Sequence, residues 1–423
     1  MIKNTMKLGR IYPEKTTRLV VPVLFWATGI VSIIAGLFRV WAVRSLLFRG
    51  DVGRGSVIST IHLFTLGGLT MLMMGALYQL GPVLLNCDPV ATRYSFSQWA
   101  IYLIGITFFV FGLNDNWRLG LALGGIGVSA GIVFFLINMV GRIRRRNTWN
   151  GPALFFATAL AYLALTLGLG LLLLLRYTTG GPSLAHELSV HLTVALGGWF
   201  GFLVTGVSYR LWAMFGRRHH QPQYWIWTWA LGNTAIVLLV TGYVSGVLWL
   251  TDGGWVCQLV AFGFYGTDIV AAGMLDRRTM TDPALRTLVP SLASLALWEL
   301  LGSWAMLGRH ELWVPALFVY GLGWVGMSFL GFVQKILPFM VWLHRYAHVH
   351  GQGKMPRLED IWHPSWGYGP IVGTILGLAL MLIGYGTVSG PVFTVGVGLQ
   401  ILAWMLLIAT GARALWGPHR PLR

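Results

Sequence analysis

The stretch GWFGFLVTGVSYRL, residues 198–211, is apolar and carries two glycines eight positions apart. Its framework occurs three times in the chain: a first glycine, a second at +8, Tyr or Gln at +11, and Leu or Ile at +13. The three sets are Gly198, Gly206, Tyr209 and Leu211; Gly67, Gly75, Tyr78 and Leu80; and Gly323, Gly331, Gln334 and Ile336. The first glycines are 131 residues (67 to 198) and 125 residues (198 to 323) apart. This regular spacing predicts an internal repeat.

The chain as a whole is too apolar for a water-soluble fold. Of its 423 residues, 56% are hydrophobic and only 10% are charged, which is far from the composition of soluble domains. Apolar runs of roughly 20 residues without strict alternation favour membrane-spanning helices over a barrel. We therefore expect an all-α polytopic protein, a single transmembrane domain over residues 1–423 that contacts the lipid bilayer.

Twelve spans are predicted, and the glycine framework falls on the second, sixth and tenth. The spans are 19–41, 57–80, 96–114, 118–140, 153–175, 187–212, 225–250, 255–275, 287–307, 313–343, 366–387 and 392–415. Because four crossings return the chain to its starting side, the repeats 19–140, 153–275 and 287–415 share one orientation. We expect a pseudo-threefold arrangement of four-helix arcs, with the stripes of small residues facing the interior of the bundle.

The basic residues indicate orientation. Lys and Arg number 30 against 13 Asp and Glu, but they lie in short loops beside apolar spans, a pattern typical of membrane topology and not of nucleic-acid binding. Most of these loops and both ends of the chain lie on one side. We therefore expect cytoplasmic termini and a multi-pass protein of the cytoplasmic (inner) membrane. Arg44, Arg49 and Arg54 fall on the other side, where they suggest a docking surface for an anionic partner.

Two segments begin with a histidine and run into the framework, HLFTLGGLTMLMMGALYQLGP (62–82) and HLTVALGGWFGFLVTGVSYRL (191–211). The chain resembles catalytic subunit I of the heme-copper oxidases and their looser NnrS-type relatives. The resemblance lies in the twelve spans, in both termini on the inner side of the membrane, and in these histidines near the outer ends of the second and sixth spans. KILPFMVWLHRY (335–346) is also similar to such relatives. The resemblance implies respiratory redox chemistry involving nitric oxide or dioxygen, with respiratory or cytochrome subunits as partners.

The resemblance also implies cofactor ligands. His62 matches the axial ligand of a b-type heme, and His191 matches a ligand of copper. Glu187, one turn before His191, is placed to orient its ring or to join a metal site. His186 is a further metal candidate, although its position is more typical of a helix start. A regular helical projection from the glycines puts His62 and His191 on unlike faces, which favours two sites, or one site and one structural contact, over a single metal site.

Four of the six metal ligands of the family are absent. Its seventh span carries a histidine pair, but residues 225–250 contain no histidine. Its tenth span carries two histidines, but the corresponding residues here are Ala316 and Phe318. We therefore expect no complete heme-copper binuclear centre. The cofactors that the remaining ligands could still hold are a single heme, or copper near His191.

Four charged residues within the spans are further candidates, because charges in a membrane are costly. Asp268 and Glu299 are expected near mid-membrane, where they would form a proton path or pair with a base. Arg210 and Lys335 both lie at framework position +12, near the cytoplasmic ends of their spans. The main expectation for these two is snorkelling to the interface, with a heme propionate or proton-path role as the alternative.

Two other functions stay open, and the sequence does not decide whether the chain is an enzyme. One is a non-catalytic scaffold or assembly subunit of a respiratory membrane complex. The other is a twelve-helix transporter, although parallel repeats count against the common inverted-repeat design.

Overall fold

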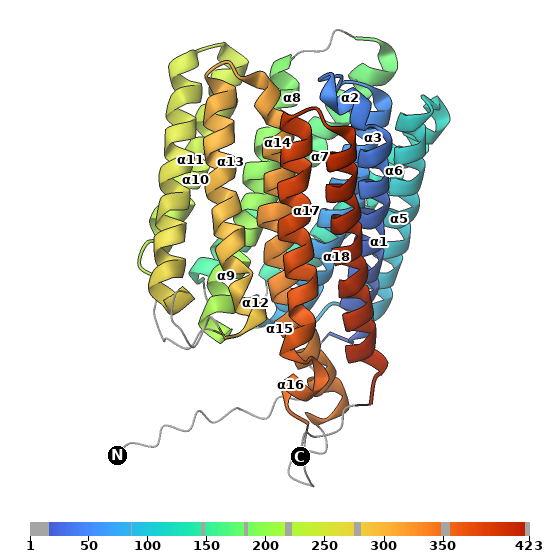
Figure 1. Ribbon diagram of the computed structural model, residues 1–423, viewed down its shortest axis with the longest axis vertical. Coiled ribbons are helices and arrows are strands. Elements are labelled where there is room, and N and C mark those ends of the chain that lie inside the picture. The colour runs from blue at the N-terminus through green and yellow to red at the C-terminus, as the bar shows by residue number, and fades with distance from the viewer. Residues whose placement is uncertain are drawn as a thin grey trace.

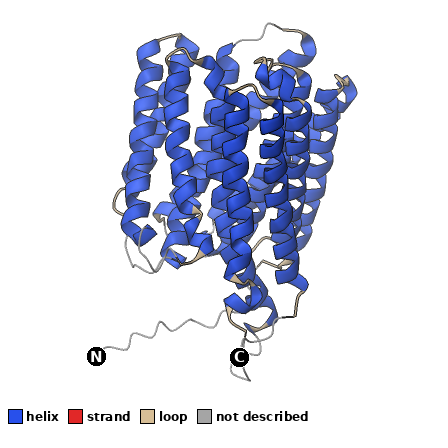
Figure 2. Ribbon diagram, viewed as in Figure 1, coloured by secondary structure: helices blue, strands red, loops and turns tan. Residues whose placement is uncertain are grey.

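The computed structural model describes residues 17–85, 87–144, 149–181, 185–215, 222–274, 281–347 and 356–418. Within these ranges the chain forms a bundle of helices without a strand (Figures 1 and 2). Twelve helices are long and apolar enough to cross a membrane. Large apolar side chains such as Ile126, Val237 and Leu248 are more than half exposed on its surface. The expectation of an all-α, multi-pass protein in contact with lipid is confirmed.

The twelve spans are built from the following helices. The first four comprise α1 (Val20–Ala42); α3 (Gly55–His62), η2 (Leu63–Thr70) and α4 (Met71–Leu85); α5 (Thr92–Asn114); and α6 (Arg118–Ile143). The next four comprise α7 (Gly151–Thr179); α8 (Ala185–Leu192), η3 (Thr193–Gly201) and α9 (Phe202–Phe215); α10 (Trp225–Ser245); and α11 (Leu248–Ile269) with η4 (Val270–Met274). The last four comprise α12 (Pro283–Arg286) and α13 (Leu288–Met306); η5 (His310–Leu312), α14 (Trp313–Phe318), η6 (Val319–Gly326) and α15 (Met327–Arg345); η8 (Pro364–Gly367) and α17 (Tyr368–Gly386); and α18 (Gly390–Trp416). The short helices α2 (Arg44–Phe48) and α16 (Leu358–Ile361) lie between spans.

One boundary between spans differs clearly from the prediction. Helix α10 ends at Ser245, since Gly246 has a left-handed φ of 72° and forms its C-cap. A left-handed glycine is a common helix terminator. As a result α11 begins at Leu248, seven residues before the predicted start of the eighth span at 255.

The second, sixth and tenth spans each contain a π-helical segment, namely η2, η3 and η6. Each segment ends three residues after the first glycine of its framework, at Thr70, Gly201 and Gly326. A π turn releases carbonyl groups from the helical ladder. Hydroxyl groups of other spans donate to two of these, Tyr102 to Leu66 O (3.3 Å) and Tyr320 to Leu196 O (2.6 Å). The π-helical segments therefore provide acceptors for hydrogen bonds that link one span to another.

The framework glycines pack against the preceding span of their own repeat. A Cβ atom at each glycine would meet a side chain there, and the pairs are Gly67–Ser32, Gly75–Phe25, Gly198–Tyr162, Gly206–Phe155, Gly323–Ser294 and Gly331–Thr287. In every repeat the two opposing residues are seven positions apart. The expectation that these stripes face a shared interior was wrong, because they provide close approach between neighbouring helices. The three repeats nevertheless share one packing register.

The second, sixth and tenth spans also contact one another, and they are the most buried of the twelve. In their most apolar windows 61%, 72% and 78% of residues are buried, against at most 50% elsewhere. Trp199 Nε1 in η3 donates to Thr70 Oγ1 in η2 (3.3 Å). The Tyr320 bond links the tenth span to the sixth, and a Cβ on Gly321 would lie 3.0 Å from Phe64 of the second. These spans form the centre of the bundle, while a threefold axis relating the arcs stays a prediction.

The first two repeats share a further bridge outside the framework. Trp99 Nε1 on α5 donates to Thr28 Oγ1 on α1 (3.1 Å), and Trp229 Nε1 on α10 donates to Thr158 Oγ1 on α7 (2.9 Å). Each residue of the second bond lies 130 positions after its counterpart in the first, since Trp229 follows Trp99 and Thr158 follows Thr28 at this spacing. The same indole–hydroxyl bond therefore fixes the third span against the first in both repeats.

An even number of spans brings the two ends of the described chain, Thr17 and Pro418, to the same side of the bundle. The terminal segments 1–16 and 419–423, which were used to predict orientation, lie outside the described residues, as do most of the basic loop residues. The cytoplasmic location of the termini stays a prediction.

Candidate functional site

His62 and His191 lie at the same end of two contacting spans. His62 is the last residue of α3, directly before η2, and His191 is in α8, two residues before η3. Their spans are joined by the hydrogen bond from Trp199 in η3 to Thr70 in η2. The regular projection had put them on unlike faces, but it assumed uniform α-helix between each histidine and its glycine. Part of that interval is π-helical, which changes the angle per residue.

The His62 ring is held in one orientation by its own helix. Its Nδ1 donates to the Ile58 carbonyl (2.9 Å), and its ring meets Phe109 edge-on, with centroids 5.4 Å apart. A carbonyl partner on Nδ1 fixes the tautomer and leaves the Nε2 lone pair for another group. Metal-binding histidines are commonly arranged in this way.

The His191 ring has an unsatisfied nitrogen. Its Nδ1 is buried without a hydrogen-bond partner among the described residues. The ring lies against the backbone of Thr166 on α7, and a Cβ on Gly170 would come within 3.3 Å of its Cε1 atom. Buried polar atoms without partners are rare in native structures and call for a ligand, a water or an ion.

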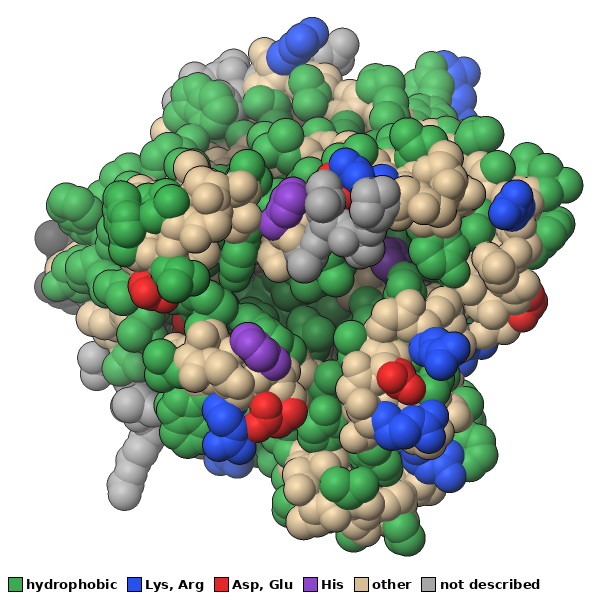
Figure 3. All heavy atoms as spheres, turned by 90° about the horizontal axis from the view of Figure 1, so that it is seen from above, with side chains coloured by type: hydrophobic (Ala, Val, Ile, Leu, Met, Phe, Trp, Pro, Cys, Tyr) green, Lys and Arg blue, Asp and Glu red, His purple; other side chains and the backbone are tan. Residues whose placement is uncertain are grey.

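The end of the bundle that carries α3, α8 and α14 is hollowed at its centre. Figure 3 shows this face, with histidine side chains around an apolar hollow. Apolar side chains border this hollow, and such a lining disfavours a fully hydrated ion.

Glu187 pairs with a different residue from the one expected. Its Oε1 lies 2.8 Å from Arg176 Nη2 on α7, so this ion pair ties the start of α8 to the preceding span. Its Oε2 is buried and has no hydrogen-bond partner among the described residues. His186 is the second residue of α8 and is partly buried. In the described ranges, no three His, Cys, Asp or Glu side chains form a group that could hold a metal ion.

Asp268 lies near the end of α11 opposite to the histidines, and not near mid-membrane. Its carboxylate accepts from the backbone N–H groups of Gln223 (2.8 Å) and Tyr224 (3.0 Å), just before α10 begins, and from Tyr209 Oη (3.1 Å). The early start of the eighth span at Leu248 moves Asp268 toward its end. An anion at a helix N-terminus is stabilised by the free N–H groups there.

Glu299 is buried in the middle of α13, as expected. It is 3% exposed, and its Oε1 accepts from Gln258 Nε2 on α11 (2.8 Å). Its Oε2 is buried without a hydrogen-bond partner in the described part of the chain. Asp268 and Glu299 do not touch, but Tyr209, Thr228 and Gln258 lie between them.

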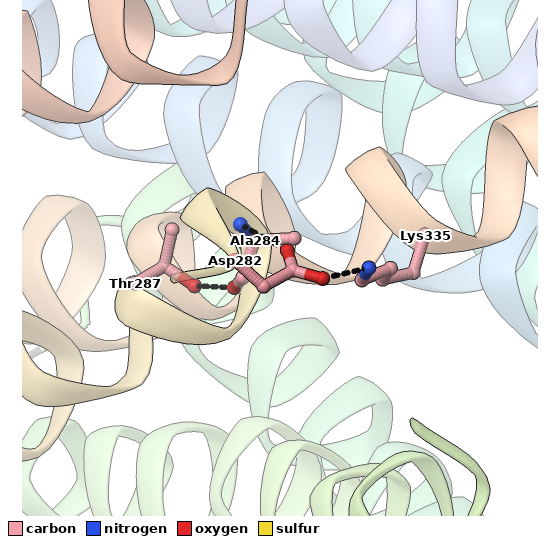
Figure 4. A network of polar contacts seen from close by, with 4 residues as sticks. All are labelled: Asp282, Ala284, Thr287 and Lys335. Carbon is pink, nitrogen blue, oxygen red and sulfur yellow. Dashed lines mark hydrogen bonds and ion pairs between the residues drawn. The ribbon is translucent and has the colours of Figure 1, made fainter. Parts of the chain in front are cut away.

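Lys335 forms an ion pair with Asp282, which precedes α12 (Figure 4). Asp282 also caps α12 by accepting from Ala284 N (3.1 Å), and Thr287 Oγ1 donates to Ala284 O (2.6 Å). Asp282 was not among the predicted site residues, although Asp-Pro is a typical helix start. Arg210 on α9 is partly buried, with an Nε that has no partner among the described residues. The ion pair of Lys335 replaces the simple snorkelling expected for it.

Comparison with protein-family models and with curated proteins finds no match to this chain.

Proposed function

We propose that this chain binds a b-type heme at the hollowed end of the bundle, with His62 as an axial ligand and His191 beside it, and serves respiratory redox or nitric oxide and dioxygen chemistry. The observation that carries the proposal is that two histidines lie at the same end of the contacting second and sixth spans. Hydrogen bonding leaves Nε2 of His62 for another group, and Nδ1 of His191 is buried without a hydrogen-bond partner in the described ranges. Imidazole is the commonest protein ligand of heme iron in oxygen- and electron-carrying proteins.

The donor set fits heme better than copper. A heme brings four nitrogen ligands of its own, so the protein supplies only one or two axial groups. A copper ion held by protein alone takes three or more ligands. No group of that size occurs among the described residues. Copper at His191 with Glu187 and His186 is therefore the second choice, and it would require these side chains to move.

The protein residues would hold and shield the group. Ile58 fixes the His62 tautomer, and Phe109 covers one edge of the ring. The Arg176–Glu187 pair holds α8, which carries His191, against α7. Bound heme would supply one-electron transfer or reversible binding of a diatomic gas. If both His62 and His191 held the heme, it would supply electron transfer, whereas a heme held by His62 alone would be able to bind a gas.

The setting proposed for this activity is the cytoplasmic membrane, with cytochrome or other respiratory subunits as partners. The absence of histidine from residues 225–250 is the reason to propose one iron and not a binuclear centre.

Absorption spectroscopy of protein purified from heme-supplied cells tests the proposal. We expect a Soret band in the wild type that is lost in His62→Ala and shifted in His191→Ala. The control is His310→Ala, because His310 is exposed at the same end of the bundle. Added carbon monoxide distinguishes one axial histidine from two. A folded, colourless protein, or a band that survives both substitutions, would contradict heme binding and favour the scaffold or transporter.

A further inference from the structure

A line of polar side chains runs through the second repeat and away from the histidines. It begins at Asp268, which accepts from Tyr209 Oη, and Tyr209 Oη also bonds with Thr228 Oγ1 on α10 (3.1 Å). All three residues are at most 4% exposed. The bonds are continuous from the carboxylate to the threonine.

A cavity of about 30 Å³ continues the line. Thr228 and Thr205 line it, as does Gln258, and the rest of its wall is glycine and apolar side chains. A water needs roughly 10–15 Å³ measured in this way, together with two or more polar partners. The cavity therefore has room for about two waters between the threonine hydroxyls and Gln258.

Gln258 separates this cavity from Glu299. Its side chain borders the cavity, and its Nε2 donates to Glu299 Oε1. The groups that face the carboxyl are Gln258, Tyr320 and Trp298, and none of them carries a positive charge. An unpaired carboxylate in a membrane interior is costly, so we expect Glu299 to be protonated at rest.

We propose that these residues form a proton path, which begins at the buried Asp268 near the end of α11 and leads to Glu299, which stores a proton in the interior, with Gln258 as the gate between the cavity water and Glu299. In each step one O–H bond breaks as the next forms, along Asp268, Tyr209, Thr228 and the cavity water. No electron moves, so no redox partner is needed. Rotation of Gln258 brings water to the unpartnered Oε2 of Glu299. The path does not depend on a bound heme.

The length of the path suits a half-membrane route. Gln258 and Asp268 are ten residues apart on α11, which is roughly 15 Å of helix. This is about half of the 30 Å hydrocarbon core. The line therefore connects one side of the membrane with its middle.

The first repeat provides an internal comparison. There Tyr78, at the same framework position as Tyr209, bonds with Gln98 on α5 (3.3 Å) and with Asn138 on α6 (3.1 Å). Asn138 and Asp268 are 130 residues apart and occupy corresponding positions. An amide therefore satisfies the packing at this position, and the carboxylate of the second repeat adds a group that can exchange a proton.

Infrared difference spectroscopy in H₂O and D₂O tests the path. The band of a protonated carboxyl group, identified by its loss in Glu299→Gln, should shift as deuterium reaches Glu299. We expect Tyr209→Phe and Thr228→Val to slow this exchange by about 100-fold, the scale of a lost proton-transfer group. Gln258→Leu should slow it and Gln258→Ala should speed it, because leucine closes the gate and alanine opens it.

Two control variants separate this effect from damage to the fold. Thr228→Ser keeps the hydroxyl and should restore the wild-type rate, and Tyr78→Phe makes the same change in the repeat without the carboxylate and should have no effect. The proposal is overturned if no Glu299 band exists. It is equally overturned if exchange keeps its rate in both Tyr209→Phe and Thr228→Val. Both readouts are independent of heme, so loss of the proposed cofactor would leave this test unaffected.

Discussion

The orientation of the His62 ring depends on the carbonyl group of Ile58, one turn earlier in the same helix. The sequence places a histidine at this end of the second span, and the structure agrees. The tautomer follows from helical geometry, since a residue four positions back presents its carbonyl to the side chain. By contrast, the Arg176 partner of Glu187 comes from the preceding span. Sequence spacing along α8 favoured His191 as that partner, because it considers only one helix.

The close approach of Gly75 to α1 gives a prediction at the residue scale. A Cβ there would lie 2.7 Å from Phe25 Cβ and 2.9 Å from Trp26 Cδ1, both buried. Gly75→Val should therefore destabilise the protein by about 1–3 kcal/mol through overpacking. Thermal unfolding in detergent measures the effect.

Gly263 provides the matched control, since nothing lies within 4 Å of a Cβ atom at this position of α11. Gly263→Ala should leave the unfolding midpoint unchanged or raise it, because alanine favours helix. Equal midpoints for Gly75→Val and the wild type would refute the proposed contact between the two spans.

At the scale of elements, the three π-helical segments were not predicted. A single extra residue in a turn leaves composition and hydropathy unchanged. One trace was visible, because His62 lies five residues before its framework glycine and His191 lies seven before its own. Corresponding residues in uniform helices would keep equal offsets. The difference of two residues has two sources: η3 has nine residues against eight in η2, and Leu192 lies between His191 and η3 whereas His62 directly precedes η2.

The bond between Trp199 and Thr70 gives a prediction for these elements. Thr70→Val removes the acceptor with little change of shape and leaves the buried indole N–H of Trp199 unpaired. This should cost about 1–3 kcal/mol, measured as a lower thermal midpoint. Thr107→Val is the control, because the exposed Thr107 bonds only with Leu103 O in its own helix. If both variants unfold at one temperature, η2 and η3 are not joined by this bond.

At the scale of the whole molecule, hydropathy predicted the number of spans and their order, because length and apolar content suffice for both. The boundary at Gly246 was missed, since it depends on backbone conformation and not on hydropathy. The burial of the second, sixth and tenth spans agrees with the central place expected for them. The side of these helices on which the glycines lie could not be predicted from the sequence. Small residues are needed both where a neighbouring helix comes close and where a central ligand comes close.

The orientation of the molecule in its membrane can be tested by cysteine labelling. Asp115 is exposed after α5, at the end that carries the histidines, and Glu359 is exposed in α16 at the other end. In a background with Cys87 and Cys257 replaced by serine, Asp115→Cys should react with an impermeant maleimide in intact cells. Glu359→Cys should react only after permeabilisation. The reverse pattern would invert the predicted topology.

The wide turn in the tenth span has a consequence for how the site relates to the scaffold. Segment η6 ends at the same register as η2 and η3, yet the residue before it is Phe318, where the second span has His62. Because η6 forms without a histidine directly before it, a π-helical segment at this position does not require a bound iron. The three π-helical segments therefore belong to the scaffold. Any ligand of the two histidines binds to a scaffold that forms without it.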